Sequence, residues 1–157
     1  MLGCFLPWTT YGTWLPGDER GWVNRHRTHG ERVDAPGFTL EKHARQLLQE
    51  APLIMDLTMR KTVKGAIRQS CHRQGWDLRT IDVRSNHVHL VVVAPEETSA
   101  KVMAVLKLAG RKALKTVVNR SCFWTRSGST RVLYTEASLE AAIRYVANQR
   151  TSWMKGV

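Results

Sequence analysis

Apolar residues recur at about every fourth position in two long segments, which predicts two amphipathic helices. The first begins at Asp56, whose side chain can cap the first turn, and ends near Gln74, where Gly75 follows. Its apolar stripe contains Met59, Val63 and Ile67. The second begins with Ser99 as its cap and ends near Val118. Its apolar stripe contains Val102, Leu106, Ala109, Ala113 and Val117.

Two other segments show helical spacing over a shorter length. One is predicted over Thr39–Gln49, with Thr39 as its cap, and Pro52 ends the segment that follows. Its apolar residues are Leu40, Ala44, Leu47 and Leu48. The other begins at Glu136 and is expected to reach about residue 153. Its buried stripe is predicted to contain Leu139, Ile143 and Val146.

The remaining apolar segments have the composition of strands. Phe5–Trp14 is rich in aromatic residues and threonine. Trp76–Arg84 and His87–Val93 form a candidate hairpin around a tight turn at residues 84–87. The second of these is apolar or carries imidazole on both faces, as a central strand does. Two more extended segments are expected around residues 127–129, namely Cys122–Arg126 and Thr130–Thr135.

The order of these elements is strand, helix, strand, strand, helix, strand, helix. It predicts an α+β fold, a ferredoxin-like split βαβ with an antiparallel sheet, helices on one face and an additional C-terminal helix. A length of 157 residues supports one domain over residues 1–157. Within that domain, residues 14–37 are expected to form a long polar loop.

The positive charge of the sequence is concentrated in the middle of the chain. Residues 56–126 contain fourteen Lys and Arg against five Asp and Glu, which is +9 of the total net charge of +11. Such a field attracts polyanions, above all nucleic acid. On the two central helices, basic residues repeat at four-residue spacing on a face away from the apolar stripe. These candidate DNA-binding residues are Arg60, Lys64, Arg68, Lys107, Arg111 and Lys115.

Composition excludes several other classes of protein. A hydrophobic fraction of 43% is ordinary for a globular chain and argues against disorder, collagen-like repeats and coiled coils. No apolar run is long enough to span a bilayer. The three cysteines are widely spaced and form no Cys-x-x-Cys pair, which argues against a disulfide framework or a zinc ribbon. We therefore expect a cytoplasmic protein.

Two motifs could carry chemistry. His87 and His89 are two residues apart in a predicted strand, so both imidazoles project from one face, where they can share a divalent cation. Tyr145 and Gln149 are four residues apart on the last helix and share one of its faces. Two imidazoles and an amide oxygen would suit Mg²⁺ or Mn²⁺, and a metal-polarised phosphodiester could be attacked by the phenol. Each motif alone is also compatible with a packed histidine pair or with a half-buried tyrosine.

Together these motifs resemble the HUH single-tyrosine transposases, in particular the tyrosine transposases associated with repetitive extragenic palindromes. The resemblance is carried by Asn86–Leu90, Tyr145–Gln149 and Trp8–Gly12. It implies a ferredoxin-like enzyme that binds hairpin-flanked single-stranded DNA, cleaves it with divalent metal and keeps a 5′-phosphotyrosine. His87, His89 and Gln149 would then be metal ligands, and Tyr145 would be the nucleophile. Gln149 stands where palindrome-associated members often have Asn.

Two departures limit what the resemblance implies. The segment Trp14–Asp34 is longer than the matching loop of compact relatives, and the sequence ends eight residues after Gln149. The short tail favours an active site completed within one chain, and leaves open whether the protein is a monomer or a homodimer.

Two alternatives remain at this stage. Ferredoxin-like sheets also serve as non-catalytic nucleic-acid-binding modules, which a domesticated or decayed transposase would resemble. The presence of all four site residues argues against this. A two-histidine phosphoesterase is disfavoured because the chain lacks the paired His-x-Ser/Thr motifs that such enzymes have.

Overall fold

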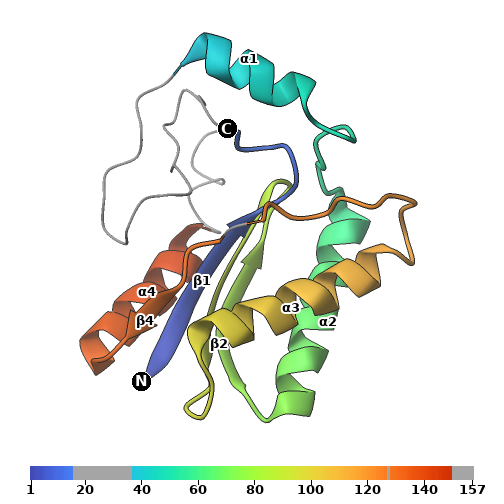
Figure 1. The fold of residues 1–157 in the computed structure, drawn as a ribbon. Coiled ribbons are helices and arrows are strands. Elements are labelled where there is room, and N and C mark those ends of the chain that lie inside the picture. Colours follow the sequence, from blue (N-terminus) through green and yellow to red (C-terminus); the bar gives the residue numbers. More distant parts are fainter. Residues whose placement is uncertain (16–36, 127, 150–157) are drawn as a thin grey trace.

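The computed structural model describes residues 1–15, 37–126 and 128–149. In chain order its elements are β1 (Gly3–Thr9), α1 (Phe38–Gln46), α2 (Leu57–Gln74), β2 (Asp77–Val83), β3 (His87–Val93), α3 (Ser99–Leu114), β4 (Arg131–Leu133) and α4 (Glu136–Gln149). The four strands form one antiparallel sheet in the order β2-β3-β1-β4. This is the predicted α+β fold with a split βαβ core, to which α1 and α4 are added (Figure 1).

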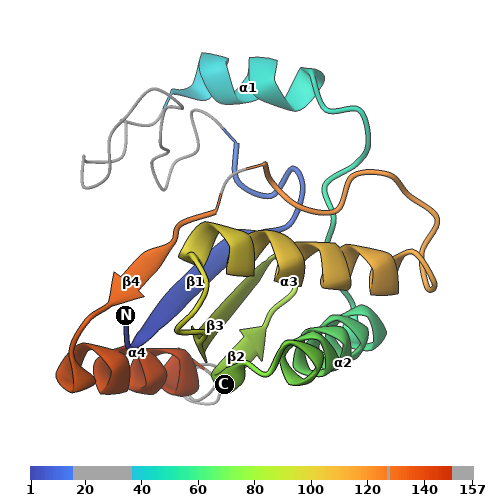
Figure 2. The ribbon, with the colours of Figure 1, turned by 60° about the horizontal axis from the view of Figure 1, so that its bottom comes forward.

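The sheet has a helical layer on each face, and α4 lies on the other side of the strands from α2 and α3 (Figures 1 and 2). Side chains from β1 and β3 fill the space under α2 and α3, where Leu6, Val88 and Leu90 are fully buried against Ile67 and Leu106. The face under α4 has a smaller apolar cluster. Its buried residues are Val91, Leu133, Leu139 and Val146.

The hairpin of β2 and β3 forms as predicted. The backbone N–H of Arg84 donates to the carbonyl of His87 (2.8 Å) and closes the turn. β3 then pairs with β1 on its other side, so it is the central strand that its two apolar faces predicted. The turn is tied to β1 as well, because Thr10 donates its backbone N–H (2.8 Å) and its hydroxyl (3.1 Å) to the carbonyl of Asn86.

The ends of α2 follow the predicted signals, whereas those of α3 do not. Asp56 caps α2 by accepting from the Met59 backbone, and Gly75 ends it in the left-handed conformation. In α3 the cap is Thr98 rather than Ser99, and the helix ends at Leu114 rather than near Val118. The prediction of its stripe was also wrong in part, because Ala109 and Ala113 are only half-buried and Val117 is exposed. The residues of α3 that are buried are Val102, Met103, Leu106, Gly110 and Leu114.

Three other boundaries differ from the prediction. β1 ends at Thr9 rather than Trp14, because the chain turns at Gly12, whose φ of 74° favours glycine. The segment Cys122–Arg126 contributes a single bridge, between Trp124 and Thr10, instead of a strand. Helix α1 begins after Gly37 instead of Thr39, and none of its residues is buried.

Parts of two predictions lie outside the described residues. Most of the polar loop predicted over residues 14–37 does, as do the last residues of the helix predicted to reach residue 153. Among the described helices, none combines the length and the apolar character that a membrane span needs. Cys4, Cys71 and Cys122 are all free thiols.

Candidate active site between the central strands and the C-terminal helix

The alternation of β3 places its two histidines on the α4 face of the sheet. Val88 and Leu90 point into the core under α2 and α3, so His87 and His89 point the other way. Their rings lie 4.6 Å apart, centroid to centroid. Both side chains are half-buried. The spacing therefore brings the two imidazoles together as predicted.

Helix α4 brings Tyr145 and Gln149 to the same place. The Tyr145 ring centroid is 6.0 Å from that of His89, and the side-chain oxygen Oε1 of Gln149 accepts from Nδ1 of His89 (3.0 Å). The helix is held there by Leu139 and Val146, which pack against Val91 of β3. Tyr145 is 51% exposed, so its phenol can be reached from solvent. All four residues that the sequence selected are thus neighbours within one chain.

The surroundings hold the imidazoles in the neutral form. Burial lowers the pKa of His87 to about 4, helped by the adjacent His89 and Arg84 and opposed by Asp82 and the Gln149 amide. Burial also lowers the pKa of His89, although Gln149 and Asp82 oppose it. Neutral imidazole is the form that binds metal, so both side chains are ready ligands at neutral pH.

The Nε2 atom of His87 is suited to bind a metal. Nδ1 of His87 donates to Oδ1 of Asn86 (2.7 Å), which leaves the lone pair on Nε2. That Nε2 is buried with the Gln149 amide nearby, and no donor among the described residues reaches it in hydrogen-bond geometry. A buried nitrogen lone pair without a donor is stabilised by a cation. The residues present therefore fit a divalent metal.

A third protein ligand beside the two imidazoles would be an amide oxygen. No group of three or more His, Cys, Asp or Glu in residues 1–15, 37–126 and 128–149 is placed to hold a metal ion. Oε1 of Gln149 is the amide oxygen beside the pair, 3.0 Å from Nδ1 of His89. Mg²⁺ and Mn²⁺ accept such oxygen ligands and keep open positions for phosphate.

Sequence reasoning missed an ion pair that borders the site. Asp82 of β2 lies directly opposite His89 in the strand register, and its carboxylate accepts from Nε of Arg84 (2.6 Å). Both side chains are largely buried, with 11% and 18% exposure. Nη2 of the same arginine donates to the backbone carbonyl of Gln149. Arg84 thereby joins the last turn of α4 to β2, where a cation also complements the helix dipole.

Phe5 is a second residue that the sequence did not single out. Its ring makes edge contacts with Tyr145 (5.8 Å between centroids) and with His89 (5.7 Å). The Tyr145 and His89 centroids are themselves 6.0 Å apart, so the three rings form a triangle, and Phe5 limits where the Tyr145 ring can move. Strand pairing alone creates this contact, and nothing in local spacing could have found it.

The six basic residues selected from the sequence do not line this site. Arg60, Lys64 and Arg68 belong to α2, and Lys107, Arg111 and Lys115 belong to α3 and its C-cap, on the other side of the sheet. Arg68, Arg111 and Lys115 are exposed there.

The other three, Arg60, Lys64 and Lys107, are half-buried. Arg60 is half-buried, and its Nε has no partner among the described residues. Lys107 is covered by the segment at Thr125. Its Nζ donates to the carbonyl of Thr125 (2.6 Å), and burial lowers its pKa.

Known proteins resemble this chain in sequence or in fold. Residues 48–149 match the family model described as "Transposase IS200 like". A candidate transposase of Deinococcus radiodurans R1, solved by crystallography, has a similar fold, with a TM-score of 0.54 at 16% identity over 94% of this chain and 90% of that one. So has a REP-associated tyrosine transposase bound to a REP hairpin, with a TM-score of 0.56 at 11% identity over 96% and 67%. None of the curated proteins searched matches the sequence.

Proposed function

Because the chain belongs to the family of IS200-like transposases, we propose that it cleaves hairpin-flanked single-stranded DNA and retains a 5′-phosphotyrosine for strand transfer. The observation that carries this proposal is the position of Tyr145, exposed to solvent and 6.0 Å from the His89 ring in the same chain. A nucleophile held next to a metal-binding pair is the arrangement that phosphoryl transfer requires.

In the proposed reaction, the phenolic oxygen of Tyr145 attacks the scissile phosphorus. A bond forms between that oxygen and phosphorus, and the bond from phosphorus to the 3′-oxygen breaks. The phenol loses its proton, and the departing 3′-oxygen takes one up as a hydroxyl. The phosphotyrosine retains the energy of the original bond, so a 3′-hydroxyl can later attack it and rejoin two strands.

His87, His89 and Gln149 would hold the Mg²⁺ or Mn²⁺ cofactor. A bound divalent cation polarises the phosphodiester and neutralises its charge. Asn86 keeps the His87 proton on Nδ1, so that Nε2 is free to act as a ligand. Phe5 and α4 orient the Tyr145 ring towards the imidazoles.

The proposed partner is single-stranded DNA with palindromic hairpins. A total net charge of +11, mostly in residues 56–126, supports a nucleic-acid ligand. The similarity to a transposase bound to a REP hairpin makes a hairpin the first DNA to try. The exposed cations of α2 and α3 are candidates for backbone contacts away from the cleavage site. Because Tyr145 lies beside His89 of its own chain, a monomer suffices for one site, and a homodimer would carry two.

The test uses end-labelled single strands with hairpins from the flanks of the gene, incubated with Mn²⁺ or with EDTA. We expect a denaturant-resistant protein–DNA adduct with Mn²⁺ only, and no adduct from the Tyr145→Phe protein. Tyr134→Phe is the matched control, because Tyr134 is 75% exposed and lies outside the site. DNA binding without adduct or cleavage across several flanking substrates would instead favour a non-catalytic DNA-binding module.

A further inference from the structure

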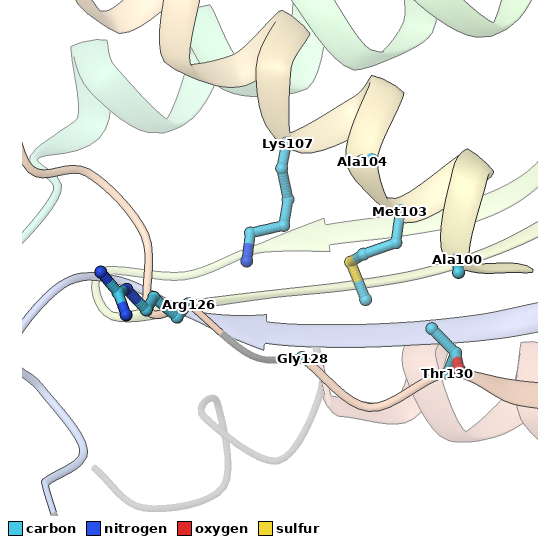
Figure 3. A pocket seen from close by; sticks show the side chains of 7 residues that line it. All are labelled: Ala100, Met103, Ala104, Lys107, Arg126, Gly128 and Thr130. Carbon is cyan, nitrogen blue, oxygen red and sulfur yellow. The ribbon is translucent and has the colours of Figure 1, made fainter. Parts of the chain in front are cut away.

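A groove of about 500 Å³ runs between α3 and the chain near the start of β4. Figure 3 shows Met103 and Lys107 projecting from α3 towards the chain at Arg126 and Gly128. The chain comes close here because position 128 has no side chain, and a Cβ would lie 2.9 Å from Cε of Met103. The residues that line the groove are Ala100, Met103, Ala104, Lys107, Arg126, Gly128 and Thr130.

The chemistry of these walls suits a nucleotide. Ala100 and Ala104 are exposed on the wall of the groove, and the largely buried Met103 (7% exposed) adds the edge of a polarizable side chain, so the face of a base can pack there. Lys107 and Arg126 provide two positive charges, and none of the described residues that line the groove is acidic. A volume of this size accommodates a small number of ligand groups rather than a duplex.

Lys107 is held in the groove rather than extended into solvent. Its Nζ donates to the carbonyl of Thr125 (2.6 Å), while its own carbonyl accepts from Nε1 of Trp124 (2.9 Å). An ammonium group has three hydrogens to donate, so the bond to Thr125 leaves further donors for an anion. The cation is pre-positioned, which reduces the entropy lost when a phosphate binds.

The groove is connected to the candidate active site through a short series of contacts. The Thr125 backbone N–H donates to the carbonyl of Thr9 (3.1 Å), and the two hydroxyls are 3.0 Å apart. Thr9 in turn lies opposite His87 in the register of β1 and β3. Two strand spacings of about 4.8 Å each separate the backbone of Thr125 from that of His87. The groove faces α3 and the imidazoles face α4, so a DNA strand that reaches both sites passes around this edge of the sheet.

We propose that this groove binds the single-stranded DNA that flanks the scissile phosphate. One base packs against Met103 and the alanines, and the adjoining phosphates contact Lys107 and Arg126. The proposal rests on the proposed function, since it assigns the groove to the same DNA substrate. On this proposal, the N-terminal half of α3 binds the single-stranded flank, and the DNA hairpin binds elsewhere on the protein.

The test measures binding in the Tyr145→Phe background, so that no chemistry occurs. Three oligonucleotides are compared, each with the same hairpin: one with both flanks of the cleavage site, one without the 5′ flank and one without the 3′ flank. We expect one of the two truncations to weaken binding about tenfold, as the loss of a stacked base and its phosphate would.

Groove variants then show whether that flank lies here. Ala104→Leu fills the groove from an exposed helix position, and Lys107→Met removes the charge while keeping the aliphatic stem. Each of these two variants should bind the full oligonucleotide about tenfold more weakly than the parent does. Each should also bind the full and the truncated oligonucleotides with equal affinity. For Lys107→Met, the slope of log affinity against log salt concentration should fall by about one, as expected for the loss of one phosphate contact. Matched controls are Lys112→Met on α3 and Ala137→Leu on α4, both exposed outside the groove.

Two results would overturn the proposal. One is an unchanged truncation effect in both groove variants, and the other is the absence of any truncation effect in the parent. Thermal melting of each variant checks that it is folded. The same substitutions are also made with Tyr145 intact, to separate this proposal from the chemistry. If the wild type forms the adduct but the groove variants bind the flank normally, only the groove proposal is wrong. If flank binding depends on the groove but no adduct forms, only the proposed chemistry is wrong.

Discussion

The two faces of strand β3 are built for different purposes. Val88, Leu90 and Val92 point under α2 and α3, are fully buried and belong to the large core. On the α4 face, His87 and His89 occupy the equivalent alternating positions, and only Val91 joins a small apolar cluster. The first face stabilises the fold by burying apolar area. The α4 face buries less apolar area, because two neutral imidazoles beside a tyrosine take the place of apolar side chains.

The comparison teaches that the fold and the site depend on different residues of one strand. Substitutions on the core face should change stability, and substitutions on the α4 face should change metal binding and cleavage. Each prediction below separates these two properties or tests a residue that connects them.

The largest effect is expected from His89→Ala. It removes a proposed metal ligand and should reduce DNA cleavage at least about 100-fold, whereas hairpin binding in EDTA should stay within about twofold. Adduct yield on gels and a binding titration measure the two quantities. His72→Ala, on the exposed surface of α2, is the control. Cleavage near the wild-type rate would remove His89 from the proposed site.

Leu90→Ala changes the neighbouring position on the other face. It leaves a cavity in the main core and should lower the free energy of unfolding by about 3 kcal/mol, as measured by urea denaturation. His89→Ala should lower it by less than about 1 kcal/mol, because no large apolar group is lost. Similar losses for the two variants would mean that both faces are structural.

Arg84→Met tests the connection between β2 and α4. Without the guanidinium, the Gln149 carbonyl and the Asp82 carboxylate both lose a partner, and Gln149 is no longer fixed beside His89. The affinity for Mn²⁺, measured by calorimetry without DNA, should fall about tenfold. Arg79→Met, an exposed position on the same strand, should leave it unchanged. An unchanged affinity in Arg84→Met would show that Gln149 is positioned by α4 alone.

The smallest effect expected is a pH dependence of stability in the metal-free protein. Burial lowers the pKa of His87 to about 4, below the usual 6.5 that it regains on unfolding. The unfolded chain therefore takes up a proton first, and the free energy of unfolding should fall as the pH drops from 6.5 towards 4. We expect a loss of about 1 kcal/mol between pH 7 and pH 5.5, measured with EDTA present. His87→Asn should flatten this slope, and an identical slope would contradict the assignment.

The sequence predicted those features of the fold and the site that depend only on residues close together in the chain. The pairs His87/His89 and Tyr145/Gln149 are set by the periods of a strand and a helix, so spacing alone placed each pair on one face. The α2 boundaries were equally local, since Asp56 and Gly75 act within one turn.

The features that the sequence did not reveal depend on contacts between distant segments. Asp82 reaches His89 only through the register of β2 and β3, and Phe5 reaches Tyr145 only because β1 pairs with β3. Lys107 looked solvated on its helix but is covered by the chain at Thr125. In α3, the close approach of Trp124 to Gly110 helps to bury a different stripe from the one predicted.

The most direct test of the account is to locate the covalent link. Adduct formed with Mn²⁺ is digested with nuclease and trypsin, which cuts after Arg144 and Arg150 and releases residues 145–150 as one peptide. If Tyr145 is the nucleophile, this peptide carries a nucleotide attached through phosphate to Tyr145, and the nucleotide is absent when EDTA replaces the metal. A nucleotide on any other peptide, or cleaved DNA with no modified peptide, would contradict this role of Tyr145.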